Sequence, residues 1–256
     1  MVVPKKYEML GEDKIESNDG KSTVYRIRAL RDFGVVKKGD LGGYIQYEHN
    51  LDHDGDCWVF GDAIVCECAR VQDNAMVGWY AKVAGYAKVC DNAVVSGESV
   101  VSDNATIRDY AAIFGDRECG VGDYSIVEGR AHVFGSAKLS EHALVTDDAR
   151  ICFDGIIGGH SVVDKHAEID EDCDAYVVRD VVKILSRRFS SRDNTFMVFN
   201  TKQGEFRITC GNFGGSLEDF RYEIGSQFQR GSRPYEAYNA LLQMLEYKLN
   251  NGKEED

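Results

Sequence analysis

The sequence predicts a mainly β protein whose central part is a solenoid of short, stacked strands. Between residues 63 and 111 a small residue recurs at every sixth position, and an aliphatic residue follows each one two positions later. Gly, Asp or Asn usually fills the positions between these triplets. A fixed short period is typical of a solenoid, because each unit buries its apolar face against its neighbours. A helical period of 3.6 residues would not keep the small residues in one slot.

Each hexad reads as a short strand followed by a corner. The small–x–aliphatic triplet places two side chains on one face of a strand and one on the other. The Gly, Asp and Asn residues between triplets tolerate left-handed backbone conformations and favour turns. The small residues are Ala63, Ala69, Ala75, Ala81, Ala87, Ala93, Ser99, Ala105 and Ala111, and the aliphatic residues are Val65, Val71, Val77, Val83, Val89, Val95, Val101, Ile107 and Ile113. We expect both sets to point inward.

The pattern V-x-G/D-N/D-A-x resembles the hexapeptide repeat of left-handed parallel β-helices, in which three hexads form one triangular coil of about 18 residues. The resemblance covers residues 55 to about 178 and implies a left-handed parallel β-helix solenoid of about six to seven coils, which we assign to residues 55–180. The register breaks once, because "FGDRECGVGDYSIV" after Ile113 carries two extra residues. The slots are expected to resume at Ser125 and to continue through Ala131, Ala137, Ala143, Ala149, Ser161, Ala167 and Cys173. We expect a corner bulge at the insertion, with a functional loop as the alternative.

Both ends of an open solenoid need a cap, since they expose unpaired strand edges. Residues 1–54 are the predicted N-terminal β cap, with a strand in "STVYRIRALR" at 22–31. The stretch "RIRALRDFG…GDLGGYI" resembles the opening of uncharacterised hexapeptide-repeat proteins of bacteria and their phages, which brings no assigned activity.

Residues 181–256 are predicted to form a small C-terminal ββαα module. "TFMVFN" and "EFRITC" read as a hairpin around "TKQG". A helix follows with Ser216 as N-cap and Leu217, Phe220 and Ile224 on one face. "RPYEAYNALLQMLEYKL" predicts a second helix, with Ala237, Leu241, Leu245 and Leu249 at fourfold spacing. This module resembles a C-terminal segment of phage proteins of unknown function, and we expect a cap or an oligomerisation element.

Composition excludes several classes of function. The net charge of −13 argues against nucleic-acid binding, and no apolar run approaches the length of a signal-peptide core or a bilayer span. We therefore expect a soluble, cytoplasmic protein with neither a nucleic-acid nor a membrane partner. The eight cysteines include only one close pair, Cys66 and Cys68, which lacks the C-x-x-C spacing of a zinc site. They read as reduced packing thiols, with no metal and no cofactor.

The candidate site residues come from stacking coils of about 18 residues. Residues one coil apart lie at strand spacing, about 4.8 Å, so Tyr124, His142 and His160 are predicted to form an outward-facing ladder. His132 and Arg150 form a second outward pair on another face. Together they offer an aromatic ring, imidazole donors and a guanidinium, which suit an anionic, nucleotide-like ligand.

The resemblance implies an alternative, because many hexapeptide-repeat proteins are acyltransferases that use a CoA-type donor. A histidine general base is then needed, and His142 or His160 would supply it. The sequence lacks the P-loop, H-E-x-x-H and G-x-S-x-G motifs and a long substrate-capturing loop. Whether the chain is an enzyme stays open, and the balance is against catalysis.

Two outward columns are apolar: Trp58, Met76, Val94 and Ala112 in the first half, and Ile126, Leu144 and Val162 in the second. Something must cover them, either the C-terminal helices or another subunit, and the resemblance implies a homotrimer. The leading hypothesis is a non-catalytic binding protein of phage or prophage type, which holds a small anionic ligand in clefts between subunits. One interpretation is that it sequesters a nucleotide signal of host defence. An acyltransferase and a purely structural assembly protein are the alternatives.

Overall fold

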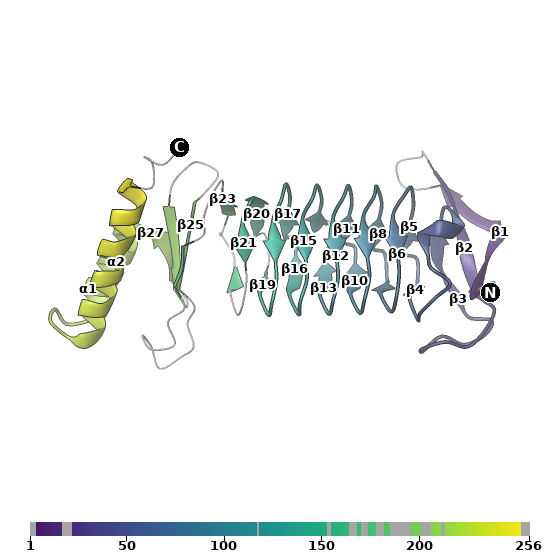
Figure 1. Ribbon diagram of the computed structural model, residues 1–256, viewed down its shortest axis with the longest axis horizontal. Helices are drawn as coiled ribbons and strands as arrows, with labels where there is room; N and C mark the ends of the chain where they lie inside the picture. Colours follow the sequence, from purple (N-terminus) through teal and green to yellow (C-terminus); the bar gives the residue numbers. More distant parts are fainter. Residues whose placement is uncertain are drawn as a thin grey trace. The chain divides into compact units, whose positions relative to one another are not determined.

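A computed structural model describes residues 4–16, 22–116, 118–152, 155–163, 168–169, 174–177, 182–184, 196–200, 206–210 and 213–251. It confirms the predicted fold class, a parallel β-solenoid of about six coils with two helices near the C-terminus (Figure 1). The chain divides into two compact units, residues 1–179 and residues 180–256, which are described separately.

The solenoid has three faces, each a parallel sheet of very short strands. Face 1 contains β4 (Trp58–Val59), β7 (Met76–Val77), β10 (Val94–Gly97), β13 (Ala112–Gly115), β16 (His132–Gly135), β19 (Arg150–Ile151) and β22 (Glu168–Ile169). Face 2 contains β5 (Ile64–Val65), β8 (Lys82–Val83), β11 (Val100–Val101), β14 (Gly120–Val121), β17 (Lys138–Leu139), β20 (Ile156–Gly159) and β23 (Asp174–Val177). Face 3 contains β6 (Arg70–Val71), β9 (Lys88–Val89), β12 (Thr106–Ile107), β15 (Ile126–Val127), β18 (Leu144–Val145) and β21 (Val162–Val163).

The interior follows the hexad pattern. Every predicted small residue from Ala63 to Ala149, together with Ser161, is buried, and so are the aliphatic residues from Val65 to Val163. Cys57 fills the same small-residue slot one hexad before Ala63 and is fully buried. Ala167, Cys173 and the side chain of Ile169 lie outside the described residues. The inward assignment is therefore confirmed wherever the structure describes it.

The corners are built on residues with a positive φ, many of them aspartates. Asp73, Asp91 and Asp109 have φ between 57° and 60°, a region that Asp and Asn tolerate better than most residues. The Asp73 carboxylate accepts the backbone N–H of Asp91 at 3.1 Å, and Asp91 accepts that of Asp109 at 3.2 Å. Each corner carboxylate thus fastens its own coil to the next one.

The two extra residues lengthen one coil, as predicted, but the small-residue slots resume earlier in the sequence than predicted. Val94 pairs with Ala112, 18 residues on, whereas Ala112 pairs with His132, 20 residues on. The slots resume at Cys119 and Val121, both 1% exposed, and not first at Ser125. Cysteine is small and apolar enough to occupy an alanine slot, so the predicted restart was one hexad too late.

The N-terminal cap continues the sheet of face 2. Strand β3 (Leu41–Ile45) pairs parallel with β5, and β2 (Thr23–Ala29) and β1 (Tyr7–Glu16) add antiparallel strands. A short 3₁₀ helix, η1 (Glu48–Asn50), leads into the first coil. The strand predicted at 22–31 is confirmed, whereas β1 has no clear alternation and was not predicted.

Lys6 closes the N-terminal end of the solenoid from inside. Its side chain is fully buried, and its Nζ donates to the carbonyl oxygen of Cys57 at 2.9 Å and contacts the Cys57 Sγ at 3.2 Å. The same ammonium lies 5.0 Å from the centre of the Phe33 ring. A buried charge is tolerated here because carbonyl oxygens and an aromatic face replace its water.

Unit 2 consists of a four-stranded antiparallel sheet and two helices. The sheet order is β24 (Val182–Ile184), β25 (Phe196–Asn200), β26 (Phe206–Cys210) and β27 (Phe213–Ser216), and the helices are α1 (Leu217–Gln227) and α2 (Arg233–Asn251). The predicted hairpin is confirmed as β25 and β26. Strands β24 and β27 were not predicted, the latter because Gly214 and Gly215 give it little strand propensity.

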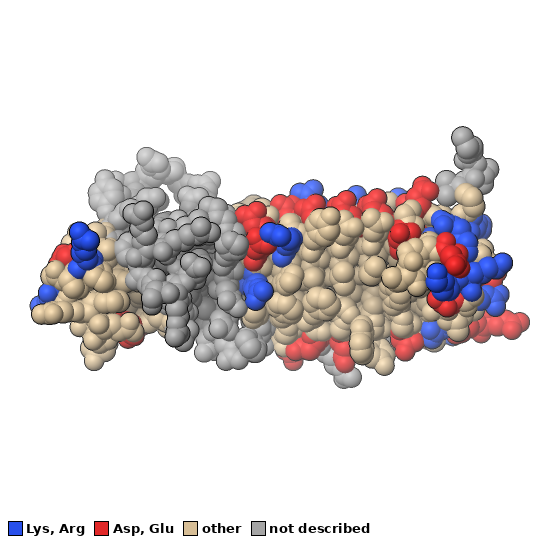
Figure 2. Space-filling view, turned by 90° about the horizontal axis from the view of Figure 1, so that it is seen from below, with Lys and Arg blue, Asp and Glu red and all other residues tan. Residues whose placement is uncertain are grey.

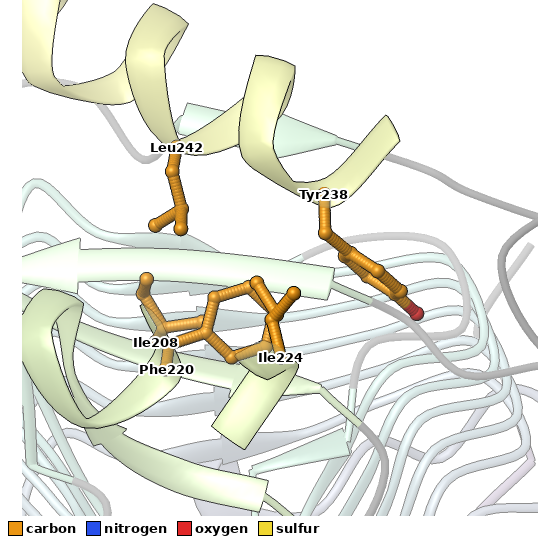
Figure 3. Packing of buried hydrophobic residues seen from close by; sticks show 5 residues of the cluster. All are labelled: Ile208, Phe220, Ile224, Tyr238 and Leu242. Atoms are coloured by element: carbon orange, nitrogen blue, oxygen red, sulfur yellow. The ribbon is translucent and has the colours of Figure 1, made fainter. Parts of the chain in front are cut away.

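The core of unit 2 lies between the sheet and both helices, where Ile208, Phe220, Ile224, Tyr238 and Leu242 pack together (Figure 3). The predicted N-cap is confirmed, since Ser216 accepts the N–H of Asp219 at 3.1 Å. Among the described side chains of α2, those of Tyr238 and Leu242 are buried, and each lies one position beyond a predicted residue, Ala237 or Leu241. The side chains of Leu241, Leu245 and Leu249 lie outside the described ones. In the described part of the chain, neither helix is both long and apolar enough to cross a membrane.

Candidate ligand-binding surface

The predicted ladder of Tyr124, His142 and His160 forms at the corner between faces 2 and 3. The Tyr124 and His142 rings stack with centroids 5.1 Å apart and an interplanar angle of 13°. His142 and His160 stack at 4.8 Å and 2°. Tyr124 is 58% exposed, and both imidazoles are exposed too. Because the rings lie against one another, their edges, with the hydroxyl and the imidazole nitrogens, face solvent.

The side chains of the ladder are held by the backbone below them. The N–H of Tyr124 donates to the carbonyl of Glu141 at 2.8 Å, and the N–H of His142 donates to that of Gly159 at 2.9 Å. The structure shows no hydrogen bond between either imidazole and a described carboxylate, the partner that commonly orients a general-base histidine.

His132 and Arg150 are neighbours on face 1, as predicted, because β16 and β19 pair them in register. Arg150 is exposed, and on its other side it pairs in register with Glu168 of β22. His132 packs edge-on against Phe134 at 5.4 Å, and Phe134 stacks with Phe114 at 6.1 Å. The two phenylalanines were not singled out in the sequence, although both follow an inward aliphatic residue at a fixed offset.

The structure does not bring the two groups of predicted residues together within one chain. Tyr124, His142 and His160 lie at the corner between faces 2 and 3, whereas His132 and Arg150 lie on face 1. The two groups do lie at the same height along the solenoid axis. His132 belongs to the same coil as Tyr124, and Arg150 belongs to the same coil as His142. A site that uses both groups therefore needs a second copy of the chain.

Face 1 is the least charged side of the solenoid. Its outward side chains from Met76 to Phe134 include no Lys, Arg, Asp or Glu. The strands of face 1 lie along the lower side of the solenoid in Figure 1. Figure 2, seen from below, shows a broad uncharged surface there between two rows of acidic side chains. Its apolar side chains that are not fully buried include Met76, Val94, Phe114 and Phe134.

The predicted apolar columns are aligned as expected, but two members of the first column, Trp58 and Ala112, are already buried. Trp58 is only 1% exposed, because Tyr7 and Phe33 of the N-terminal cap pack against its ring at 6.2 and 5.3 Å. Met76 and Val94 remain half-buried on face 1. Ile126 and Leu144 are half-buried on face 3, and Val162 is 42% exposed. The cap thus covers only the first residue of the first column.

The described cysteines are free thiols, and four of the six are buried. Burial raises the pKa of Cys90 and of Cys119 to about 11, which keeps both thiols protonated and unreactive. Ligand atoms of Asp73, Cys90 and Asp91 lie within 4.8 Å of one another. Within this group the Asp73 carboxylate accepts the backbone N–H of Asp91 at 3.1 Å, and the Cys90 thiol donates to Asp91 Oδ2 at 3.6 Å.

No protein-family model and no curated protein matches this chain.

Proposed function

We propose that the chain is a non-catalytic binding protein of the hexapeptide-repeat class, and that its ladder of Tyr124, His142 and His160 holds a small anionic ligand such as a nucleotide. The observation that carries this proposal is the exposed stack of three rings at 4.8–5.1 Å. A tyrosine face suits a planar ring, and imidazole N–H groups suit phosphate oxygens. A sequence of net charge −13 needs such local donors to attract an anion.

The proposed binding form is a homotrimer with clefts between subunits. Half-buried Ile126 and Leu144 on face 3 and the uncharged stretch of face 1 favour contact between copies. Because His132 and Arg150 lie at the levels of the ladder, side-by-side packing of parallel solenoids would place one subunit's Arg150 near a neighbour's rings. The guanidinium would add charge-assisted hydrogen bonds to the anion. We place this protein in the cytoplasm of a bacterial host, encoded by a phage or prophage and sequestering a nucleotide signal.

The test is ligand screening followed by calorimetry. Thermal shift of the purified protein with acyl-CoA, cyclic nucleotides and ADP-ribose-type nucleotides identifies the class that binds. His142→Ala and Arg150→Ala should each weaken binding of that ligand by about 1–3 kcal/mol, the cost of losing a charge-assisted hydrogen bond. Lys82→Ala on face 2 is the matched control. Unchanged affinity in both variants would refute the proposed site, and turnover of acyl-CoA would favour the acyltransferase alternative.

A further inference from the structure

The ladder belongs to a longer column that contributes one outward residue per coil. In order along the solenoid these residues are Cys68, Tyr86, Asn104, Tyr124, His142 and His160. Their backbone is regular: the N–H of Tyr86 donates to the carbonyl of Asp103 at 2.6 Å, and the N–H of Asn104 donates to that of Asp123 at 2.7 Å. This is the bond that Tyr124 and His142 make at 2.8 and 2.9 Å. The five rungs from Cys68 to His142 are therefore attached in the same way to the coil that follows each of them.

The direction in which the rungs leave the backbone is also uniform. The residues that precede Tyr86, Asn104 and Tyr124 have φ values of 67°, 57° and 54°. Since the same backbone geometry recurs at each coil, the Cα–Cβ bonds of Tyr86 and Tyr124 leave the corner in the same direction. Tyr86 is 70% exposed, so its ring extends into solvent as the Tyr124 ring does.

Asn104 interrupts the row of rings between these two tyrosines. Two coils separate Tyr86 from Tyr124, about 9.6 Å at the spacing of adjacent strands. The asparagine side chain ends at its amide, whereas both tyrosines continue outward through a ring. The column therefore carries no ring at this coil, and we call the place beyond the Asn104 amide the open position. The rings of Tyr124, His142 and His160 are spaced by 5.1 and 4.8 Å. One ring inserted midway between Tyr86 and Tyr124 would have about the same spacing to each of them.

We propose that the planar heteroaromatic ring of a nucleotide occupies this open position, between Tyr86 and Tyr124 and with its edge on the Asn104 amide. This inference rests on the proposed function and names the part of the ligand that the column recognises. Aromatic side chains stack on any nucleobase, and an asparagine amide both donates to and accepts from a base edge. The phosphate then extends along the column toward His142. Tyr86 and Asn104 become binding residues beside the predicted ladder.

The test compares three probes: AMP, adenosine and ribose 5-phosphate, each titrated into the full-length protein by calorimetry. Asn104→Tyr fills the open position with a ring of the protein itself, and we expect it to weaken AMP and adenosine binding by about tenfold or more. Ribose 5-phosphate, which has no base, should keep its affinity. Asn92→Tyr is the matched control, because Asn92 lies at a different corner between Asn74 and Tyr110. Circular dichroism verifies that both variants are folded.

Two further variants separate stacking from the hydroxyl group. Tyr86→Leu should weaken AMP about fivefold or more, whereas Tyr86→Phe, which keeps the ring, should bind as wild type. Unchanged AMP affinity in Asn104→Tyr, together with a loss in His142→Ala, would overturn this inference and leave the proposed function standing. Failure of all three probes to bind the wild-type protein would contradict both.

Discussion

At the scale of single residues, the corners explain why aspartate and glycine recur in the hexads. An aspartate at a positive φ gives its carboxylate to the next coil, as Asp109 does to the N–H of Gly129 at 3.0 Å. Glycine is required where the next coil comes too close. A Cβ on Gly55, whose φ is +63°, would lie 2.1 Å from the carbonyl oxygen of Asp73. At this corner the distance between coils therefore requires glycine.

The serines in the small-residue slots differ in a way that the sequence does not reveal. Ser99 donates its hydroxyl to the carbonyl of Ser96 at 2.7 Å and accepts the N–H of Gly115 at 2.8 Å. Ser161 donates to the carbonyl of Gly158. The Ser125 hydroxyl is buried without a hydrogen-bond partner. The same residue type therefore stabilises the coil at two positions and costs desolvation at the third.

Ser125→Ala should raise the free energy of unfolding by about 1 kcal/mol, because it removes a buried, unpaired hydroxyl from an alanine slot. Ser99→Ala should lower it by about 1–2 kcal/mol, because the N–H of Gly115 then loses its acceptor. Urea denaturation of both variants measures the difference. A loss of stability in Ser125→Ala as large as that in Ser99→Ala would mean that the Ser125 hydroxyl has a partner after all.

At the scale of elements, no strand of the solenoid is long enough to be stable alone. Most strands span two residues, such as β9 (Lys88–Val89) and β18 (Leu144–Val145), and they persist because each is paired on both sides. The stability of each coil thus comes from stacking on its neighbours, as in other repeat architectures. Each hexad forms one side of the triangular coil. The inward small-residue position is therefore the one with the least room for a larger side chain.

Ala87→Leu and Ala143→Leu should each lower stability by about 1–3 kcal/mol, because both alanines are fully buried and a leucine overpacks the coil. The matched control is Lys88→Leu, which adds the same side chain at the next position, where it points outward. The melting midpoint measures the effect. A midpoint unchanged by either inward substitution would show that these slots are not tightly packed.

At the scale of the whole molecule, the distribution of charge limits how copies can meet. Acidic side chains border the uncharged surface of face 1 on both sides (Figure 2). The apolar residues Ile126 and Leu144 lie on face 3, in the C-terminal half of the solenoid. In a heterologous contact, face 1 of one copy meets face 3 of the next, and three such contacts form a closed ring when each relates neighbouring copies by a rotation of one third of a turn. This is the geometry that the proposed homotrimer requires.

We expect light scattering at micromolar concentration to give the mass of a trimer. Leu144→Glu and Met76→Glu should cause dissociation or aggregation, because each would bury an unpaired carboxylate in a contact between copies. Lys82→Glu, which changes the charge of an outward residue on face 2, should leave the mass unchanged. A monomeric wild-type protein would remove the proposed trimer and the clefts that depend on it.

The sequence by itself determined the solenoid, the direction of its side chains and the ladder of Tyr124, His142 and His160. A period of six fixes which residues point inward, and residues one coil apart must then lie at strand spacing. These predictions were possible because the geometry of one hexad repeats along the whole solenoid. For the same reason the hairpin and both helices of unit 2 were predictable from alternation, capping and apolar spacing.

The tertiary structure alone decided the features that depend on contacts distant in sequence. Nothing near Lys6 indicates that it contacts Cys57, 51 residues away, or that the cap buries Trp58. The 20-residue coil shifts all later pairings, and only the observed pairing of Val101 with Val121 shows that Cys119 begins the new register. The open position at Asn104 likewise emerges only once Tyr86 and Tyr124 stand two coils apart on one corner. The period of the sequence determines which side chains point inward or outward. How the ends of the solenoid are covered, and how far apart the residues of a column lie, depends on how the coils pack.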